Sequence, residues 1–495
     1  MSWPRSPRGS VGLASSLALL VALTSTGCRP RGPASRACAE FPPCPAVAPA
    51  PPVLPFERPE HLVPEHWLTR VSAPELALLD PAHLEAHNRR VEQLSKGGWP
   101  LGRWDLLSPA LPPRDLARYF PEQWRRLAEA IAAGRRVQAD GRPPRAALLE
   151  ELRAELASAE PTDELRVAFR SSPLRCYPTA EPLYEKAGDT DFDQLQCAQL
   201  RFGEPVRVFR RGRRFVYAWS TYAEGWVDPT ALTPPLGRDQ LEQYLRPRER
   251  AVVHEDRTAV FSAGSSPVLL GAAGLGLSLP LLGTEAQQLR VLAPAPSGLV
   301  EAHLPARAAS AELPPFSRAA LYRAAFRLLH TPYGWGGTGN HRDCSRLLMD
   351  LFATFGLRLP RNSRQQALSG PRQIDVARLD PAAKVAAIEA ANERGVVLLY
   401  LPGHIMLYLG REGGELFAFH QFSGYLVPCP GGGETMVRVN RAAVTSLSLG
   451  RGGSRRSFLE RITRLVVFGG LPSATVQPSQ ARLVPRPGPG ASWVR

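Results

Sequence analysis

The chain has 495 residues, which is too long for one hydrophobic core and predicts several domains. Its hydrophobic fraction of 44% and charged fraction of 21% are typical of globular proteins and exclude a chain that is disordered throughout. The net charge of +15 comes from scattered arginines, without a basic helix or a zinc-finger spacing, so it favours contact with an anionic cell wall or lipid over binding of nucleic acid.

The first 27 residues have the pattern of a secretory signal peptide. Arg5 and Arg8 precede an apolar stretch at 11–23 that is too short to span a bilayer. The following Gly-Cys pair resembles the lipobox of bacterial lipoproteins, although Ser25 stands where an aliphatic residue is usual. We expect cleavage before Cys28 and a lipid on this cysteine, with ordinary signal cleavage nearby as the alternative. Residues 28–55 are rich in Pro and Ala, which predicts an extended tether without chemistry of its own.

Residues 56–160 predict a helical domain. Apolar residues recur at helical spacing over 73–79, 81–94, 113–133 and 145–157. His61 and His66 precede these segments, while His83 and His87 have the i, i+4 spacing of a metal pair on a helix. Because no cysteine, nearby third ligand or zincin glutamate accompanies them, we interpret these histidines as part of a solvated helix face.

Two stretches of short strands follow the helical region. The first, at 161–236, contains a hairpin in which the strands 204–209 and 215–220 flank a turn of arginines. The segment 222–227 resembles the final strand of bacterial Src-homology-3-like barrels, so we predict one such barrel here and a second at 237–312. Large aromatic side chains mostly serve packing, so the barrel core is the favoured interpretation of three of them, with a glycan or peptide contact as the alternative. These residues are Trp219, Tyr222 and Trp226.

Seven cysteines fit an oxidising compartment if most of them have a role. Two pairings are open, and they join Cys176 to Cys197 and Cys38 to Cys44. Spacing alone does not establish either bond, and a free buried thiol is the alternative for Cys176 and Cys429. Prolines and glycines around Cys429 predict a loop there.

The candidate nucleophile lies in the segment 313–473. A Gly-rich loop that starts at Tyr333 leads to Asp343-Cys344-Ser345, and apolar residues then recur at helical spacing until Gly356. A thiol at a helix start is predicted to have a lowered pKa, because the helix dipole stabilises the thiolate. Asp343 suits the N-cap, and the glycines let a peptide approach the backbone. Cys344 is therefore the predicted nucleophile.

Two histidines on predicted strands can complete the site. The segments 397–401 and 404–410 predict strands around a Pro-Gly turn, and 416–420 predicts a third strand. His404 opens the second strand and can take the thiol proton, while His420 ends the third and can hold the ring of His404. Gln421 is the alternative residue for that orienting role.

The segments 333–345, 359–363 and 402–410 resemble the NlpC family of papain-like cell-wall endopeptidases. The resemblance covers about 316–472. It implies cleavage of peptidoglycan stem peptides, typically between D-glutamate and a diamino acid such as meso-diaminopimelate. It also implies roles for six residues. Cys344 would be the nucleophile, His404 the base and His420 the orienting residue, Tyr333 would lie near the thiol, and Asp343 and Ser345 would hold the substrate's free amine.

Arg346 departs from the family, in which a glycine usually follows the Cys-Ser pair. A long cation at this position would either crowd the cleft or meet a carboxylate of the acidic stem peptide, so Arg346 is also a candidate substrate-binding residue. Two alternative functions follow. One is a catalytically idle cell-wall binding or scaffolding lipoprotein, and the other is an enzyme that uses the same nucleophile for amidation, acyl transfer or hydrolysis of another amide.

The predicted architecture is α+β, with a papain-like catalytic domain preceded by a helical region and two small β-barrels. The predicted segments are the signal peptide 1–27, the anchor and tether 28–55, the helical domain 56–160, the barrels 161–236 and 237–312, the peptidase domain 313–473 and a disordered tail 474–495. We expect a periplasmic or outer-membrane lipoprotein of the cell envelope, with stem peptides and a membrane as partners. Neither a metal nor an organic cofactor is expected, because the zincin, phosphate-loop and dinucleotide motifs are missing from the sequence.

Overall fold

The computed structural model describes residues 44–96, 105–108 and 115–469, and the following account concerns these residues. The predicted signal peptide, Cys28, Cys38 and the tail at 474–495 lie outside them. Within the described ranges, none of the helices has the length and apolar character needed to cross a membrane. Helices and strands are mixed along the chain, which confirms the predicted α+β class.

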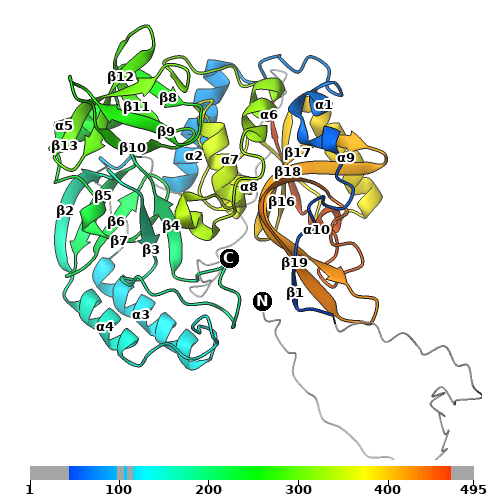
Figure 1. Ribbon diagram of the computed structural model, residues 1–495, viewed down its shortest axis with the longest axis horizontal. Coiled ribbons are helices and arrows are strands. Elements are labelled where there is room, and N and C mark those ends of the chain that lie inside the picture. The colour runs from blue at the N-terminus through cyan, green and yellow to red at the C-terminus, as the bar shows by residue number, and fades with distance from the viewer. Residues whose placement is uncertain (1–43, 97–104, 109–114, 470–495) are drawn as a thin grey trace, which may run out of the picture. The chain divides into compact units, whose positions relative to one another are not determined.

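The seven-stranded sheet that carries the candidate catalytic histidines, called the catalytic sheet below, has the strand order β1-β19-β18-β17-β16-β20-β15 (Figure 1). Its strands are β1 (Val47–Pro49), β15 (Arg372–Asp375), β16 (Val396–Leu401), β17 (His404–Glu412), β18 (Glu415–Pro428), β19 (Glu434–Ser446) and β20 (Arg464–Phe468). Neighbouring strands are antiparallel except β1, which runs parallel to β19. The two strands predicted around the Pro-Gly turn are β16 and β17, and the third is the first half of the longer β18.

Both faces of this sheet are covered, which explains the unbroken apolar run of β16. Leu398 and Leu407 belong to one buried cluster, while Leu399 and Met406 belong to another. The helices of this region are α6 (Arg318–Phe326), α7 (Cys344–Ala353), α8 (Ser363–Ser369), α9 (Pro381–Arg394) and α10 (Phe458–Arg461). The first cluster takes in α7, which contacts β17 and β18, and the second takes in α9, which contacts β16 and β20. The helix that begins at Cys344 therefore packs directly on the strands that carry His404 and His420.

The chain from Cys44 onward is attached to the catalytic sheet. A disulfide joins Cys44 to Cys429, and β1 extends the sheet at β19. The tether predicted up to residue 55 therefore does not hold for 44–55, because backbone pairing and a covalent bond fix this stretch. The predicted Cys38–Cys44 pair and the free thiol considered for Cys429 are wrong for the same reason. Residues nearly 400 positions apart in sequence give no spacing signal for such a bond.

The helical region contains η1 (Pro59–Leu62), α1 (Pro64–Leu68), α2 (Pro81–Lys96), α3 (Leu116–Ala132) and α4 (Ala147–Ala157). The helix predicted at 73–79 is absent, and that stretch forms turns. Its backbone groups bond elsewhere, because the Leu78 N–H donates to the Phe316 carbonyl and the Pro74 carbonyl accepts from the Ala319 N–H. These contacts with the start of α6 replace the short helix, whose formation would in any case be unfavourable in isolation.

The prediction that His83 and His87 lie on a solvated face of α2 holds for His83 and is wrong for His87. His83 is partly exposed and contacts the Asp80 carboxylate at 2.8 Å. His87 is buried and hydrogen-bonds through Nε2 to the Arg358 carbonyl at 2.9 Å. Burial accordingly lowers the pKa of His87. The two side chains have separate partners, so they do not form a metal pair.

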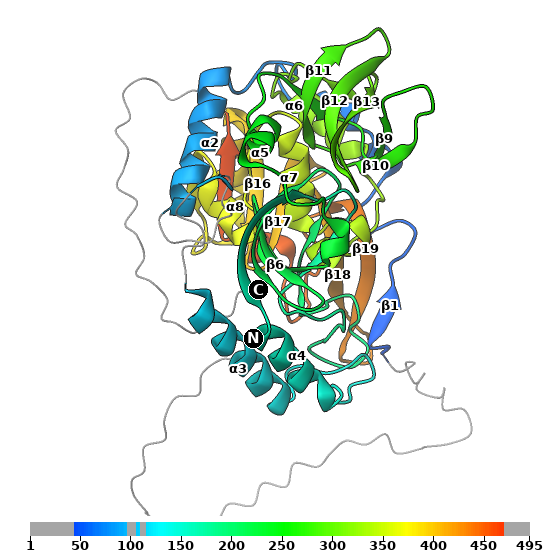
Figure 2. The ribbon, with the colours of Figure 1, turned by 90° about the vertical axis from the view of Figure 1, so that its left-hand side faces the viewer.

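The helices α3 and α4 contact each other and pack near the first upstream sheet (Figure 1 and Figure 2). This sheet has the order β2-β5-β6-β7-β3-β4. Its strands are β2 (Glu160–Val167), β3 (Ser172–Arg175), β4 (Gln196–Leu200), β5 (Pro205–Arg211), β6 (Val216–Ser220) and β7 (Glu224–Val227). The pairing of β5 with β6 confirms the predicted hairpin. A disulfide joins Cys176 to Cys197, as one of the two open pairings predicted.

The aromatic residues of this first sheet are core residues. Trp219, Tyr222 and Trp226 are all buried, and the ring of Trp226 lies 5.2 Å from that of Phe120 on α3. Their side chains are therefore used in packing, which agrees with the favoured interpretation from the sequence.

The second upstream sheet has the order β10-β9-β13-β12-β11-β8-β14. It follows η2 (Pro229–Ala231) and α5 (Arg238–Leu245), and its strands are β8 (Arg250–Val253), β9 (Thr258–Ser262), β10 (Leu269–Ala273), β11 (Ser278–Thr284), β12 (Gln288–Ala295), β13 (Gly298–Pro305) and β14 (Ala309–Ser310). Each upstream sheet thus lies where a barrel was predicted. The Src-homology-3-like class of the two sheets stays a prediction.

Candidate active site

Cys344 is the first residue of α7 and is buried. Asp343 is the N-cap, as predicted, and its side chain accepts a hydrogen bond from the Arg346 N–H at 2.9 Å. Since α7 packs on β17, the sulfur lies beside the start of that strand, where the Ile405 backbone N–H hydrogen-bonds to it. Of the cysteines in the described ranges, Cys344 is the one with a free thiol.

The glycines before the cysteine serve domain packing. The loop contains η3 (Trp335–Asn340), in which Gly336 and Gly337 have φ of 61° and 91°. A Cβ at Gly336 would lie 2.7 Å from Cγ of Gln196, and one at Gly337 would lie 2.7 Å from Cβ of Gln199. Both glutamines belong to β4, so the loop needs glycine to adopt its turn and to pack on the first upstream sheet. The sequence had suggested substrate approach as the reason.

The thiol of Cys344 does not have the lowered pKa that its helix position suggested. Burial, together with the negative charge of Asp343, raises the pKa of Cys344 to about 12. The helix dipole and the Ile405 N–H act in the opposite direction, but desolvation of a thiolate in this buried position outweighs them. Burial therefore favours the neutral thiol, and attack by this sulfur needs a neighbouring base.

Two histidines on adjacent strands are the candidates for that base. His404 opens β17 and lies with its Nε2 2.6 Å from Nδ1 of His420 on β18. Burial, together with the positive charge of Arg461, lowers the pKa of His404 to about 3. A neutral imidazole can accept a proton, and because His420 occupies Nε2, Nδ1 is the nitrogen of His404 left for the thiol.

Thr445 on β19 extends this chain of hydrogen bonds. Its Oγ1 lies 2.8 Å from Nε2 of His420, and both residues are buried. If Nε2 of His404 donates to Nδ1 of His420, then Nε2 of His420 carries a proton and donates to the Thr445 hydroxyl. In this arrangement the Thr445 hydroxyl holds the ring of His420, which in turn orients the ring of His404.

Gln421, the alternative orienting residue, does not bond to His404 but to Thr331. Its Nε2 donates to the carbonyl and the hydroxyl of Thr331, each at 3.0 Å. Alternation along a strand places neighbouring side chains on opposite faces, so His420 and Gln421 cannot share one role. The geometry favours His420.

Asp343 and Ser345 have partners within the protein. Both carboxylate oxygens of Asp343 accept from the Arg361 guanidinium, at 2.9 and 2.6 Å, and this guanidinium also donates to the Ser345 hydroxyl at 3.0 Å. Arg361 therefore lowers the pKa of Asp343 against the effect of burial. Together these contacts hold the helix start in place, and contact of Asp343 and Ser345 with a substrate amine stays a prediction.

Tyr333 lies at the start of the Gly-rich loop, and its ring centroid is 6.3 Å from that of Phe192. Burial, with the nearby Asp343 and Cys344, raises its pKa, so the phenol keeps its proton. Phe192 belongs to the loop between β3 and β4 of the first upstream sheet, and it also contacts Trp335 at 5.3 Å. The first upstream sheet therefore contributes a wall beside Tyr333.

Arg346 is buried in a network of charged residues and has three protein acceptors. Its Nε donates to Asp350 at 2.6 Å, one terminal nitrogen to the Tyr222 hydroxyl at 2.9 Å and the other to Glu204 at 2.7 Å. Asp350 also accepts a hydrogen bond from Arg342, which in turn donates to Asp256 in the turn between β8 and β9 of the second upstream sheet. Arg346 thus joins the nucleophile helix to an upstream sheet, and this structural role replaces the predicted crowding of the cleft or contact with substrate.

A cysteine at the start of a helix that packs on antiparallel strands carrying two hydrogen-bonded histidines is the arrangement typical of the papain-like class. More particularly, residues 330–443 match the NlpC/P60 family, so the chain contains an NlpC/P60 domain. No curated protein sequence gives a significant match.

The chain is also similar to solved structures. One is described as a novel NlpC/P60 endopeptidase from Photobacterium damselae subsp. piscicida, with a TM-score of 0.65, 16% identity and coverage of 82% of this chain and 97% of that chain. An NlpC/P60 family protein from Bacillus cereus ATCC 10987 has a TM-score of 0.42 and 15% identity, over 61% of this chain and 99% of that chain. The first likeness shows that the shared fold extends beyond the NlpC/P60 domain.

Proposed function

We propose that this protein is a cysteine endopeptidase that hydrolyses peptidoglycan stem peptides, at the bond between D-glutamate and a diamino acid such as meso-diaminopimelate. The observation that carries the proposal is the buried thiol of Cys344 at the start of α7, together with the packing of α7 on the strands that carry His404 and His420. These two histidines form a hydrogen-bonded set with Thr445. The NlpC/P60 domain and the cell-wall substrates of the family it resembles supply the substrate class.

The reaction would proceed in two steps. In the first, Nδ1 of His404 takes the proton of the Cys344 thiol, and the sulfur attacks the glutamyl carbonyl carbon. The tetrahedral intermediate collapses, His404 returns the proton to the leaving amine, and a thioester to Cys344 remains. In the second step His404 activates water, which releases the glutamyl acid and restores the thiol.

The neutral resting pair agrees with this scheme, because the proton moves only when a substrate is in place. Burial disfavours both the thiolate of Cys344 and the imidazolium of His404. A bound carbonyl that accepts the developing negative charge near the start of α7 would remove part of this penalty.

The alternative of a catalytically idle scaffold rests on Arg346 crowding the cleft, and the position of this side chain weakens that alternative. This side chain is held by Asp350, Glu204 and Tyr222, and it is the start of a link to the first upstream sheet. An enzyme that performs another acyl-transfer reaction with the same nucleophile is distinguished by its products.

The proposed location is the bacterial cell envelope, with the chain secreted through its signal peptide and anchored to a membrane by a lipid on Cys28. The two disulfides support export, since such bonds persist in oxidising compartments. Metabolic labelling with a radioactive fatty acid tests the anchor, with Cys28→Ser as the control that should lose the label.

Synthetic stem peptides test the bond specificity. We expect the protein to release an L-Ala–D-Glu dipeptide from a peptide with a free N-terminal amine and meso-diaminopimelate at the third position. A matched peptide with α-linked in place of γ-linked glutamate should stay intact. Release of any other fragment would contradict the proposed bond while leaving the nucleophile unaffected.

A further inference from the structure

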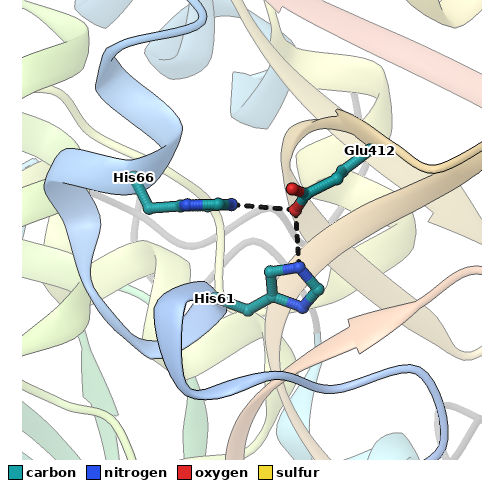
Figure 3. A group of neighbouring side chains, drawn as sticks. All are labelled: His61, His66 and Glu412. Carbon is teal, nitrogen blue, oxygen red and sulfur yellow. Dashed lines mark hydrogen bonds and ion pairs between the residues drawn. The ribbon is translucent and has the colours of Figure 1, made fainter.

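Two histidines of the N-terminal segment meet a glutamate from the catalytic sheet (Figure 3). His61 belongs to η1, His66 belongs to α1, and Glu412 ends β17. The fold thus brings a third candidate ligand to these histidines from about 350 positions later in the chain. One ligand atom of each residue lies within 4.8 Å of the others.

The three side chains converge on one oxygen atom. Oε2 of Glu412 lies 2.6 Å from Nε2 of His61 and 2.9 Å from Nε2 of His66. The other carboxylate oxygen, Oε1, accepts from Arg70 at 2.8 Å, which leaves Oε2 directed at the two imidazoles. An outer partner of this kind orients a ligating carboxylate in metal sites.

The surroundings hold the two rings in place. The ring of His61 lies 4.4 Å from that of Phe417 and 5.2 Å from that of Trp67, and the Trp67 indole N–H donates to the His61 carbonyl at 2.9 Å. His66 packs edge-on against the same tryptophan at 5.0 Å. Rigid apolar walls keep ligand atoms from turning away and lower the local dielectric, which strengthens binding of a cation.

A cavity adjoins the cluster. Its volume is about 160 Å³, and its lining includes His61, Glu412, Glu415 and Phe417. This volume can hold several water molecules, since one water occupies about 30 Å³ in the liquid. A metal ion held by three protein ligands could therefore complete its coordination with water from the cavity.

We propose that His61, His66 and Glu412 bind one divalent transition-metal ion, with zinc as the best fit. Two imidazole nitrogens and one carboxylate oxygen form a ligand set that zinc accepts in proteins, with water as the fourth ligand. The ion would replace the hydrogen bonds that the imidazoles now make to Oε2. The proposal does not depend on the proposed peptidase function.

Zinc binding requires a change of tautomer at His61. Nδ1 of this ring accepts a bond from the Arg58 N–H at 3.2 Å, so Nε2 carries the proton in the metal-free state. The ion would bind Nε2, and the proton would move to Nδ1. The long hydrogen bond from the Arg58 N–H would then be lost, and because Arg58 is exposed, its N–H could donate to water instead. Nε2 of His66 donates to the same carboxylate oxygen, so its proton must also leave that nitrogen. At His61 the neutral ring keeps its proton on Nδ1 and loses one weak hydrogen bond.

The position of the site gives the ion a structural role. Glu412 lies at the end of β17, while His404 lies at its start, and β18 returns from the adjoining turn to carry His420. An ion here would fasten η1 and α1 to the turn of the hairpin that bears both active-site histidines.

The test is titration of the full chain, made without a histidine tag, with Zn²⁺ and with Co²⁺. A Cys344→Ala background removes the free thiol as a competing ligand. We expect one tightly bound ion per chain, visible absorption bands of tetrahedral Co²⁺, and a higher unfolding temperature with zinc. His66→Ala and Glu412→Gln should each weaken binding by at least about 100-fold, as expected for loss of a direct ligand.

His83→Ala is the matched control, because His83 is a partly exposed histidine paired with Asp80 elsewhere in the chain. It should bind zinc as the parent does. If His66→Ala and Glu412→Gln bind zinc as tightly as the control, or if the parent chain binds no ion at micromolar concentration, the proposed site does not exist. Circular dichroism of the variants without metal shows that they fold, so a loss of binding reports on the ligands.

Discussion

Nε2 of His404 lies 2.6 Å from Nδ1 of His420, and this contact determines which nitrogen of His404 can serve the thiol. His420 is held in turn by Thr445, so three consecutive strands of the sheet, β17, β18 and β19, each contribute one member of the set. The site is thus oriented by strand register, which fixes side chains more firmly than a loop would.

Thr445 should act as a positioning residue. Thr445→Val keeps the shape of the side chain but leaves the Nε2 proton of His420 without an acceptor, so His420 can take the other tautomer. We expect kcat/KM to fall between about 10-fold and 100-fold, which is less than the full contribution of about 10²–10⁴ made by general acid–base catalysis. Thr445→Ser keeps the hydroxyl and should retain most activity. Equal activity of the valine and serine variants would show that the hydroxyl has no such role.

The acid limb of the pH profile should lie below the ordinary range of histidine. Only neutral His404 can accept the thiol proton, and burial together with Arg461 lowers its pKa, so the neutral form persists as the pH falls below 6.5. We expect kcat/KM to hold down to pH values below 6.5 and then to decline. Arg461→Gln should move the decline toward higher pH, whereas Arg411→Gln, on an exposed surface, should leave it in place. An acid limb above pH 6.5 in the parent would contradict the account.

Alkylation of Cys344 should be slow at neutral pH. Burial and Asp343 raise the pKa of this thiol, so the reactive thiolate is scarce at pH 7 and increases as the pH rises. The rate of reaction with iodoacetamide, followed at the Cys344 peptide by mass spectrometry, should increase continuously from pH 6 to pH 9. A rate that is already maximal at pH 6 would indicate a preformed thiolate–imidazolium pair.

Arg346 should be important for stability. Arg346→Gly restores the residue usual in the family but removes a cation from Asp350, which is buried, and from Glu204, which is partly buried. Breaking one partner of a buried ion pair costs about 3–5 kcal/mol, and we expect the lower end, because Asp350 keeps Arg201 and Arg342.

Urea denaturation provides the measurement of this loss. Arg411→Ala, which breaks an exposed pair with Glu389, should cost less than about 1 kcal/mol and serves as the control. A similar small cost for Arg346→Gly would show that the buried network does not hold the upstream sheet to the nucleophile helix.

The catalytic strands and the helix start were predictable because their signals are local. The N-cap Asp343, the apolar run after Cys344 and the Pro-Gly turn before His404 each act within a few residues. The same is true of the arginine-turn hairpin formed by β5 and β6.

Features that depend on distant contacts were missed. The Cys44–Cys429 disulfide and the meeting of His61 with Glu412 join residues that only the fold brings together. Thr445 lies just beyond the segment that matches the family, and a threonine in a β-strand has no distinguishing pattern. The raised pKa of Cys344 was also missed, because burial and not helix position dominates it.

Product analysis on a free stem peptide tests the central claim most directly. The parent chain and its Cys344→Ala variant are incubated with a synthetic L-Ala–D-Glu–meso-diaminopimelate peptide whose N-terminal amine is free, and the products are identified by mass spectrometry. The account predicts soluble L-Ala–D-Glu dipeptide from the parent only, with both proteins giving the same circular dichroism. Equal release by the variant, or no release by either protein, would contradict the assignment of Cys344 as the nucleophile of a stem-peptide endopeptidase.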